Sequence, residues 1–426
     1  MQYAALLFGM LFLLMIIGVP ISFSILGSCT IFLLLTNIKS FITLPQTFVG
    51  GMDNFVMLAV PLFTLTGYMM ENLGLSKRLI DWVECVFGRI RGAQGAILII
   101  ASAIFAALTG SGPATVAAIG GLMIAPMIES GYKKETAAGL AAVSGTLGPI
   151  IPPSGIMIIY GATMGVSVSK MFLAGAVPGI LIAAALVILN MILAKRWGIK
   201  ATEKRYDLME IIMLTKDAFG VLMLPIVVLG GIYTGIFTPT EAGTVSVLFC
   251  IALGILYKEI SWKLIVTALK KTVFTGTAIM LIIAASKILG FILSAAGIPD
   301  AIMAAVLPYL ANKYSYLILF TLILLLVGAL MEGAAAVVIL APILVPIGIE
   351  MGFDPIYLGT IFCVNLIVGF VTPPFGVNIF SATSITGCSY QKVVKGELPF
   401  LLVLIAVLLL ITFVPDISMI LVNLLY

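Results

Sequence analysis

Residues 144–154 read SGTLGPIIPPS and interrupt an apolar segment, residues 136–165, that otherwise suits a membrane-spanning helix. The stretch holds two glycines and three prolines within nine residues. Each proline removes a main-chain N–H donor and clashes with the preceding turn, so a regular helix cannot continue through it. Carbonyl groups freed in this way cannot face lipid, where an unsatisfied polar group costs several kcal/mol. We therefore predict a broken helix whose open backbone faces protein or a polar cavity, which is where transporters hold ions and substrates. The alternative is a proline kink whose free carbonyls are satisfied by neighbouring helices.

The composition is typical of a helical protein that crosses the membrane many times. Of the 426 residues, 62% are hydrophobic and 9% are charged, whereas a soluble domain is about 25% charged. Histidine is absent, which excludes histidine-based catalysis, metal ligation and proton relays. The five cysteines are scattered without a CxxC pair, so we expect small apolar fillers and neither a disulfide framework nor a transition-metal site. The sequence contains no nucleophile motif, no paired acids and no metal motif, so we do not expect an enzyme. We expect the chain to lie in the lipid bilayer and to bind no nucleic acid.

Nine long apolar segments are near or above the ~20 residues that cross the hydrocarbon core. They are residues 4–35, 50–73, 136–165, 171–194, 216–237, 241–257, 273–297, 356–386 and 398–423. Two further apolar blocks, 93–130 and 315–350, have an interruption near the middle, TGSGP at 109–113 and MEG at 331–333. Arms of roughly 17 residues are short for full spans, so we predict two re-entrant hairpins, with two tightly joined full spans as the alternative. The predicted fold class is an all-α polytopic membrane protein with two hairpins and two broken helices.

The positive charges lie mostly on one side of this predicted topology. With the N-terminus inside, 18 of the 22 Lys and Arg residues fall in cytoplasmic segments, and Lys39, Lys170 and Lys313 fall outside. This bias indicates a cytoplasmic N-terminus, a periplasmic C-terminus and hairpins that enter from opposite sides. The remaining cation, Lys287, lies within a predicted span, where a charge is a functional candidate. It could pair with Glu332, contact an anionic substrate, reach the membrane surface or face a partner subunit.

Two segments, residues 77–91 and 258–271, mix cations with tryptophan and aliphatic residues at helical spacing. This pattern is typical of helices that lie on the membrane surface. We predict two such helices, which act either as simple anchors or as arms that join a fixed frame to a moving part.

The chain also contains an internal repeat. At a shift of 221 residues, Gly112 coincides with Gly333, Gly131 with Gly352, Gly148 with Gly369, Pro152 with Pro373, Pro153 with Pro374 and Gly155 with Gly376. Residues 1–205 and 206–426 are therefore predicted repeats, each with scaffold helices, an arm, a hairpin and a broken helix, the second of which covers 356–386. Because the charges place the hairpins on opposite sides, the repeats are inverted, and such repeats hold substrate and coupling ions near the bilayer midplane.

The two hairpin tips and the two breaks form the candidate site. We expect the first tip to face the first break, and the second tip to face the second break, NLIVGFVTPPFGVN at 365–378. The candidate residues are Ser111, Gly112, Ser144, Gly145, Thr146, Gly148, Pro149, Glu332, Gly333, Asn365, Gly369, Thr372 and Pro373. Their hydroxyl, amide, carboxylate and main-chain oxygens suit a hard cation such as Na+, and half-helix N-termini suit a substrate carboxylate. For any single Ser or Thr the alternative is a hydrogen bond between helices, whereas the symmetric set favours a site.

Three of these motifs, together with one further motif, occur in an order that resembles a known family. TGSGP, SGTLGPIIPPS, GIFTPTEAG at 235–243 and NLIVGFVTPPFGVN together are similar to the large membrane subunit of tripartite ATP-independent periplasmic (TRAP) transporters. The resemblance covers essentially the whole chain.

The resemblance implies a member of the ion-transporter superfamily that works as an elevator in the bacterial inner membrane. A transport domain of hairpins and broken helices would slide against a scaffold, and uptake would be coupled to a Na+ gradient. The implied partners are a small four-helix membrane subunit, here a separate chain, and a periplasmic substrate-binding protein. The implied substrates are organic acids of the sialic acid or C4-dicarboxylate class. A stand-alone Na+/anion symporter of the same superfamily, which needs no binding protein, is the alternative, and a channel is a third reading.

Overall fold

The computed structural model describes residues 2–199, 206–306, 308, 310 and 312–426, and every regular element in these ranges is helical. The predicted repeat boundary at 205/206 adjoins residues 200–205, which lie outside the described part together with three cations of the cytoplasmic charge set. Eight of the described helices are long and apolar enough to cross a membrane, or up to ten spans if each of two bent helix pairs counts as one. The chain is therefore an all-helical polytopic membrane protein, as its composition predicts.

The first predicted span is instead two helices that fold back on each other. α1 (Gln2–Ile16) and α2 (Ile21–Thr36) are separated by a turn in which Gly18 has a φ of +88°. The ring of Tyr3, at the start of α1, lies 5.8 Å from that of Phe32, near the end of α2, so the two helices are antiparallel. The apolar run continues through the turn, and only a glycine with positive φ and a following proline end the first helix.

A bent helix pair opens the first half of the chain. α3 (Thr43–Met52) is followed by η1 (Phe55–Leu58) and α4 (Ala59–Asn72), which are bent by 52° relative to α3. The short helix α5 (Leu75–Phe87) comes next, directly after Gly74. α5 is the counterpart of the surface helix predicted at 77–91.

The second half uses a single continuous helix at the equivalent place. α15 (Trp262–Ala295) has 34 residues, and the short helix α16 (Ile298–Val306) follows Gly297. Gly74 and Gly297 have φ values of +63° and +60°, so the main chain turns in the same way before the short helix in both halves. The prediction of a separate surface helix at 258–271 is therefore wrong. Most of these residues form the start of α15, because nothing breaks the helix there. The counterpart of α5 is α16.

Both hairpin segments are pairs of antiparallel helices. The first contains α6 (Ala93–Thr109), α7 (Gly112–Thr115), the π-helical η2 (Val116–Gly120) and α8 (Gly121–Glu129). The second contains α17 (Lys313–Leu330) and α18 (Gly333–Glu350). The Tyr132 hydroxyl, just after α8, donates to the Gly92 carbonyl at 3.2 Å and closes the base of the first hairpin. The Tyr316 hydroxyl does the same for the second by donating to the Leu344 carbonyl at 3.0 Å.

Both predicted breaks are present, and each separates two half-helices. The first broken helix comprises α9 (Lys134–Ser144), α10 (Leu147–Ile150) and α11 (Gly155–Met164), with a bend of 40°. The second comprises α19 (Pro355–Gly369) and α20 (Val377–Thr386). Ser154 caps α11 by accepting a hydrogen bond from the Met157 N–H at 3.3 Å. The bond between the paired prolines is cis in both breaks.

Five further helices complete the described fold. They are α12 (Val168–Arg196), α13 (Leu208–Tyr233), α14 (Pro239–Leu256), α21 (Tyr390–Phe413) and α22 (Pro415–Leu425). The last predicted span, 398–423, is also two helices, because Pro415 follows α21 and begins α22. α22 packs on α12. The Lys170 ammonium lies 4.8 Å from the ring centroid of Tyr426, which brings the C-terminus to the start of α12.

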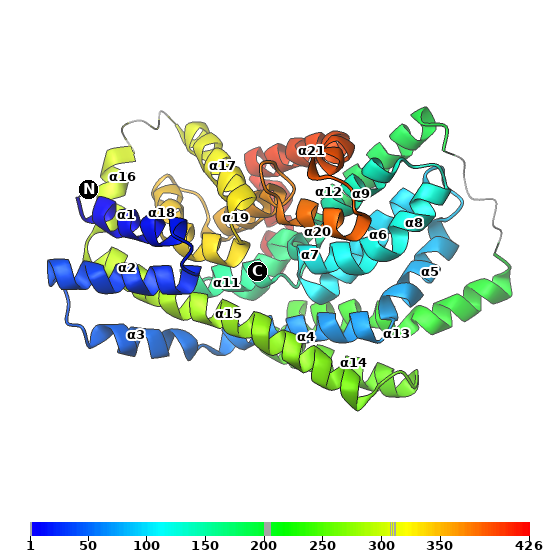
Figure 1. The fold of residues 1–426 in the computed structure, drawn as a ribbon, viewed down its shortest axis with the longest axis horizontal. Coiled ribbons are helices and arrows are strands. Elements are labelled where there is room, and N and C mark those ends of the chain that lie inside the picture. The colour runs from blue at the N-terminus through cyan, green and yellow to red at the C-terminus, as the bar shows by residue number, and fades with distance from the viewer. Residues whose placement is uncertain (1, 200–205, 307, 309, 311) are drawn as a thin grey trace.

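The helices pack in two groups that lie side by side (Figure 1). α13, α14 and α15 follow one long edge of the molecule, and α4 packs against both α14 and α15. The hairpins and broken helices fill the body beside this edge, where α9 packs on α21 and α19 packs on α17. We call α4, α13, α14 and α15 the edge group, and the hairpins with the broken helices the central group.

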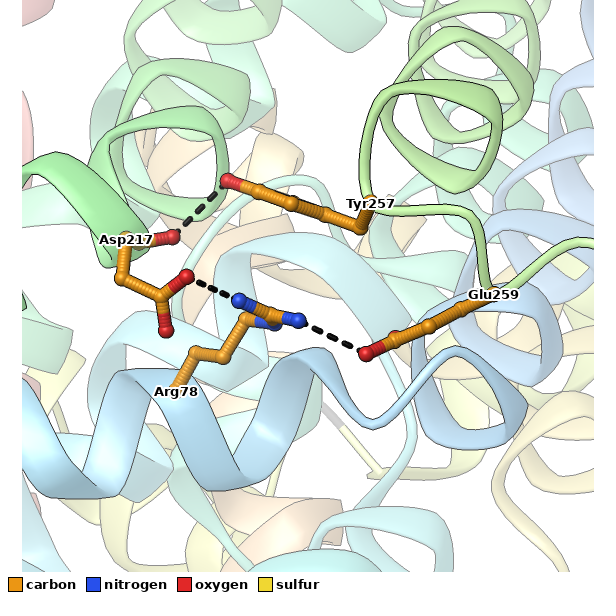
Figure 2. Close-up of polar contacts among 4 residues, drawn as sticks. All are labelled: Arg78, Asp217, Tyr257 and Glu259. Atoms are coloured by element: carbon orange, nitrogen blue, oxygen red, sulfur yellow. Dashed lines mark hydrogen bonds and ion pairs between the residues drawn. The ribbon is translucent and has the colours of Figure 1, made fainter.

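Arg78 fastens α5 to the edge group (Figure 2). Its guanidinium forms ion pairs with Asp217 of α13 and, at 2.6 Å, with Glu259 in the segment that precedes α15. It also lies 4.1 Å from the ring centroid of Tyr257, whose hydroxyl donates to the Asp217 carbonyl at 2.8 Å. One cation therefore holds together three segments that are far apart in sequence.

Replacing Arg78 with Ala is expected to lower the free energy of unfolding by about 1 to 2 kcal/mol, because a cation–π contact and two partly exposed ion pairs are lost. Thermal unfolding of the purified chain in detergent measures this change. Arg78→Lys keeps the charge but lacks the planar fork that reaches both carboxylates, so it should restore only part of the loss. Unchanged stability in Arg78→Ala would mean that the apolar face of α5 alone holds this helix.

Candidate ion and substrate site

The first hairpin tip lies directly against the first break. A Cβ added to Gly148 would lie 2.7 Å from the Ser111 carbonyl oxygen. A Cβ added to Gly112 would lie 3.2 Å from the Gly145 carbonyl oxygen, and one added to Gly145 would lie 3.1 Å from the Gly112 carbonyl oxygen. The two main chains approach this closely because glycine has no side chain to keep them apart.

Two buried polar side chains adjoin this contact and keep oxygens unpaired. Ser144 ends α9, is fully buried, and its hydroxyl has no hydrogen-bond partner among the described residues. Asn378, at the start of α20, is also fully buried; its Nδ2 donates to the Ala142 carbonyl at 3.2 Å, and its Oδ1 has no partner there. A Cβ added to Gly112 would lie 2.7 Å from this Oδ1. We call Ser111, Gly112, Ser144, Gly145 and Asn378 site one.

The second break packs against the arm that leads to the second tip. A Cβ added to Gly369 would lie 2.6 Å from the Gly328 Cα and 2.8 Å from the Ala329 main-chain N. Asn365, one turn earlier on α19, is fully buried, and its Nδ2 donates to the Ile361 carbonyl at 2.7 Å. Its Oδ1 has no partner in the part of the chain that the structure describes. We call the surroundings of Asn365 and Gly369 site two.

The second half-helices cross between the two halves of the chain. α11 packs on α18 and α19, whereas α20 packs on α9, η2 and α7. Gly333 at the second tip accordingly faces Ile156 of α11, with 2.6 Å between an added Cβ and the Ile156 Cδ1, as well as Phe370. Each break therefore also sends its second half-helix to the hairpin of the other half, a contact that the sequence did not predict.

A cavity of about 220 Å³ lies between the central group and the edge group. Its central-group wall is formed by Thr109, Gly110, Ser111, Gly112, Pro113, Ala114, Pro149, Gly155, Glu332, Ala334, Phe370 and Val377, among others. Its edge-group wall includes Tyr68 and Glu71 of α4 and Thr275 of α15. Both hairpin tips and both breaks therefore reach one cavity.

Four helix N-termini converge on this cavity. Gly112, Gly155, Ala334 and Val377 lie in the first turns of α7, α11, α18 and α20, and α7 continues through η2 and α8 as an 18-residue helix. Helix N-termini present free N–H groups and a partial positive charge, so together they suit an anionic group.

Among the described residues, two charged side chains line the cavity, and both are carboxylates. Glu71 projects from α4, and Glu332 caps α18 by accepting a hydrogen bond from the Ala335 N–H at 3.2 Å. Glu332 is exposed and lines the cavity, so its carboxylate can also accept hydrogen bonds from groups in the cavity. An anion held here would therefore be bound by main-chain N–H groups and not by an Arg or Lys side chain.

The candidate residues predicted from the sequence do not all meet. The hydroxyls of Thr146 and Thr372 donate to carbonyls of their own helices, Val143 at 2.7 Å and Val368 at 2.9 Å. Pro373 is exposed, although the corresponding prolines of the first break are buried. For the two threonines, a hydrogen bond within the helix explains the presence of the hydroxyl without an ion site. Pro149 lines the cavity.

Asn378 is missing from the residues predicted from the sequence, although it closes the motif at 365–378. At the shift of 221 it coincides with Met157, so the repeat gives it no polar counterpart. The only signal in the sequence is a lone amide directly after a break, where a polar group that becomes buried needs a partner.

Lys287 contacts neither Glu332 nor the cavity. Its Nζ donates to the Ala162 carbonyl at 3.4 Å, in the last turn of α11, and a Cβ added to Gly51 would lie 3.0 Å from its stem. A cation at a helix C-terminus interacts favourably with the exposed carbonyls. Lys287 therefore ties α15 of the edge group to α11 of the central group.

Lys287→Met is expected to lower the free energy of unfolding by about 1 kcal/mol, since the carbonyl end of α11 loses its cation. Thermal unfolding in detergent measures the loss, with Lys287→Arg as the variant that keeps the charge. A large change in substrate affinity with unaltered stability would instead indicate direct contact with the substrate.

Comparisons with known proteins point to one family. The profile of the family described as "Tripartite ATP-independent periplasmic transporter, DctM component" matches residues 8–417. Isethionate TRAP transporter permease protein DctMQ of Oleidesulfovibrio alaskensis is 36% identical over 97% of this chain, which spans 65% of that longer protein. Sialic acid TRAP transporter large permease protein SiaM of Vibrio cholerae is 34% identical over 97% of each chain.

A solved structure shares the fold. The YdaH transporter of Alcanivorax borkumensis, described as having an unusual topology, superposes with a TM-score of 0.63 at 15% identity. The match covers 88% of this chain and 87% of that one, so it extends over both halves.

Proposed function

Since the chain belongs to the DctM component family of tripartite ATP-independent periplasmic transporters, we propose that it is the carrier of a Na+-coupled system that takes up an organic acid. Family membership makes it a transporter permease for organic acids and not an enzyme. We further propose a substrate of the sialic acid or C4-dicarboxylate class, in line with the sialic acid named for the Vibrio cholerae relative.

The observation that carries this proposal is the convergence of four helix N-termini on one cavity. An organic acid in this cavity would place a carboxylate against main-chain N–H groups of α7, α11, α18 and α20. Hydroxyl or amide groups of the organic acid would reach the exposed carboxylate of Glu332. The lining offers no cationic side chain in the described residues, so the helix ends supply the positive potential.

Na+ is proposed as the coupling ion because of three buried oxygens at sites one and two. Ser144 Oγ, Asn365 Oδ1 and Asn378 Oδ1 are fully buried and unpaired within the described residues. A buried polar atom without a partner costs free energy, and a hard cation bound to these oxygens would supply the missing interaction. Ser144 and Asn365 coincide at the shift of 221, which supports two related Na+ sites, one in each half.

We propose an elevator movement in which the central group slides along the edge group. The cavity lies between these groups, so a relative displacement would expose it to one side of the membrane and then to the other. The hairpin segments 93–130 and 315–350 would then be re-entrant parts of the moving body.

The order of elements supports two inverted repeats, 1–205 and 206–426. The pair α1 and α2 corresponds to α13 and α14, the bent α3 and α4 correspond to α15, and α5 corresponds to α16. The glycines before α5 and α16 share the same positive φ. Hairpin, broken helix and long helix then follow in both halves.

The fold-back of α1 on α2 changes the proposed sidedness of the N-terminus. Both ends of this pair lie on the side of Lys39, which the charge bias places outside the bacterial inner membrane. We therefore propose a periplasmic N-terminus, and a periplasmic C-terminus near Lys170. A cysteine introduced at Gln2 is expected to react with a membrane-impermeant maleimide added to whole spheroplasts, and labelling only after lysis would reverse the assignment.

The proposed partners are a small four-helix membrane subunit and a periplasmic substrate-binding protein. The family description names one component of a tripartite system, and the Vibrio cholerae relative is named a large permease protein, which supports a separate small subunit. The alternative is a stand-alone Na+/anion symporter that needs neither partner.

Reconstitution in proteoliposomes separates these functions. Uptake of labelled sialic acid or succinate is expected only with the chain, a small subunit, a binding protein and an inward Na+ gradient together. Full Na+-driven uptake by the chain alone would support the stand-alone symporter. Uptake that ignores the Na+ gradient and shows no counterflow exchange would support a channel, because only a carrier exchanges labelled for unlabelled substrate.

A further inference from the structure

Glu397 is a carboxylic acid enclosed within a helix interface. It lies two turns into α21, a helix long and apolar enough to cross the membrane, and none of its side chain is exposed. Neither carboxylate oxygen has a hydrogen-bond partner, and no Lys or Arg forms an ion pair with it, within the residues that the structure describes.

The interface around Glu397 is closed by two glycines. A Cβ added to Gly139 of α9 would lie 2.7 Å from the Glu397 Cα. A Cβ added to Gly396 of α21 would lie 2.9 Å from the main-chain N of Thr136. The main chains of α9 and α21 are therefore in contact here, and Glu397 does not line the substrate cavity.

An ionised carboxylate in such a place costs several kcal/mol, because burial removes its hydration and no donor or cation replaces it, whereas the neutral carboxyl costs far less. We propose that Glu397 is a proton-binding site at the interface of α9 and α21. Its carboxyl holds one proton while α9 and α21 are packed, and it releases that proton to water when the two helices separate. Proton binding forms one O–H bond on a carboxylate oxygen and removes one negative charge.

Both helices of this interface carry other titratable groups. α21 contributes Tyr390, whose hydroxyl is also buried and unpaired in the described part, and the exposed Lys392 and Lys395. α9 contributes Lys134, which is exposed, and Glu135, whose main-chain carbonyl contacts Gly396. α20 carries none. On the other helices that pack on α21, the titratable groups are Lys170, Lys195 and Arg196 of α12, Lys313, Tyr314 and Tyr316 of α17, Tyr357 and Cys363 of α19, and Asp416 of α22. Tyr357 bonds to the Thr412 carbonyl, at the opposite end of α21, and Lys195 and Arg196 are exposed.

A metal cation suits this position less well than a proton does. Na+ takes several oxygen ligands at once, and the other unpaired buried side-chain oxygens of α21 belong to Tyr390 and Thr412, seven and fifteen residues away in the chain. A proton needs one oxygen only.

The proton would act on the ion site through α9. Gly139, which contacts Glu397, lies five residues before Ser144, the residue of site one that ends α9. A charge on Glu397 would draw water into the interface and move α9, and with it the Ser144 hydroxyl. Loss of the proton is therefore expected to weaken Na+ binding at site one.

Infrared spectroscopy of the purified full chain tests the proposal without any transport assay. At neutral pH the wild type should show a protonated-carboxyl C=O stretching band that shifts in heavy water and is lost in Glu397→Gln, which keeps the shape and cannot ionise. Glu350→Gln, at an exposed acid that ends α18, should keep the band. Glu397→Met, which removes the acid and the amide alike, should also lose the band, so the test survives if the Gln variant does not fold.

Absence of the band from the wild type, or its persistence in both Glu397 variants, would overturn the proposal. A second measurement follows Na+ binding to the same proteins from mildly acidic to mildly alkaline pH. The wild type should lose at least about tenfold in Na+ affinity toward alkaline pH relative to Glu397→Gln. Identical pH profiles in the two proteins would contradict the coupling between Glu397 and site one.

Discussion

In the reconstituted system, Asn378→Ala is expected to raise the Na+ concentration for half-maximal uptake about ten- to a hundredfold. The Asn378 Oδ1 is fully buried and unpaired within the described residues, and it adjoins Gly112 at the first tip. Removing an oxygen that binds a charged partner costs about 1.5 to 3 kcal/mol, and each 1.4 kcal/mol is about a tenfold change in affinity. Uptake measured against external Na+ gives the shift.

Ser144→Ala and Asn365→Ala are expected to weaken the Na+ dependence in the same direction, since each removes another buried and unpaired oxygen. Asn423→Ala is the matched control, because Asn423 is an exposed amide on α22. If the three buried variants lose protein abundance while the remaining protein keeps a normal Na+ dependence, these side chains serve only the packing of the broken helices.

Gly369→Ala is expected to abolish transport and to destabilise the fold by about 3 kcal/mol. The added methyl group would lie 2.6 Å from the Gly328 Cα and 2.8 Å from the Ala329 main-chain N. Both are main-chain atoms, so no side chain can rotate away, and the second break would have to move off the second hairpin. Size-exclusion profiles and thermal unfolding in detergent measure the loss of folded protein.

Gly290→Ala provides the control for Gly369→Ala. Gly290 lies in α15, and a Cβ added there meets no atom within 4 Å, so its replacement should leave both fold and transport unchanged. Normal transport by Gly369→Ala would mean that the break and the hairpin separate at no cost, and the close packing of site two would lose its functional importance.

The sequence predicts the parts of the fold that glycine and proline punctuate. Pro152 and Pro153, with their counterparts Pro373 and Pro374, mark both breaks because proline acts locally on the backbone. TGSGP and MEG mark both hairpin turns for a similar reason. Ser144 and Asn365 could be named because they precede these local signals.

Other features depend on packing between distant segments and could not be predicted. The apolar run at 4–35 hides the turn at Gly18, since hydropathy does not distinguish one long span from two short helices. Asn378 reaches site one only because α20 packs on α9, and no local pattern encodes that contact. The pattern at 258–271 reads equally well as a surface helix or as the end of a longer one, and α15 is continuous.

The exchange of half-helices between the two halves has a consequence for biosynthesis. Site one needs Asn378, which the ribosome adds more than two hundred residues after Ser144. The first hairpin and α9 are therefore synthesised long before the residue that completes site one, which is the proposed ion site. A nascent chain that stops before the second break would therefore lack one oxygen of the proposed Na+ site.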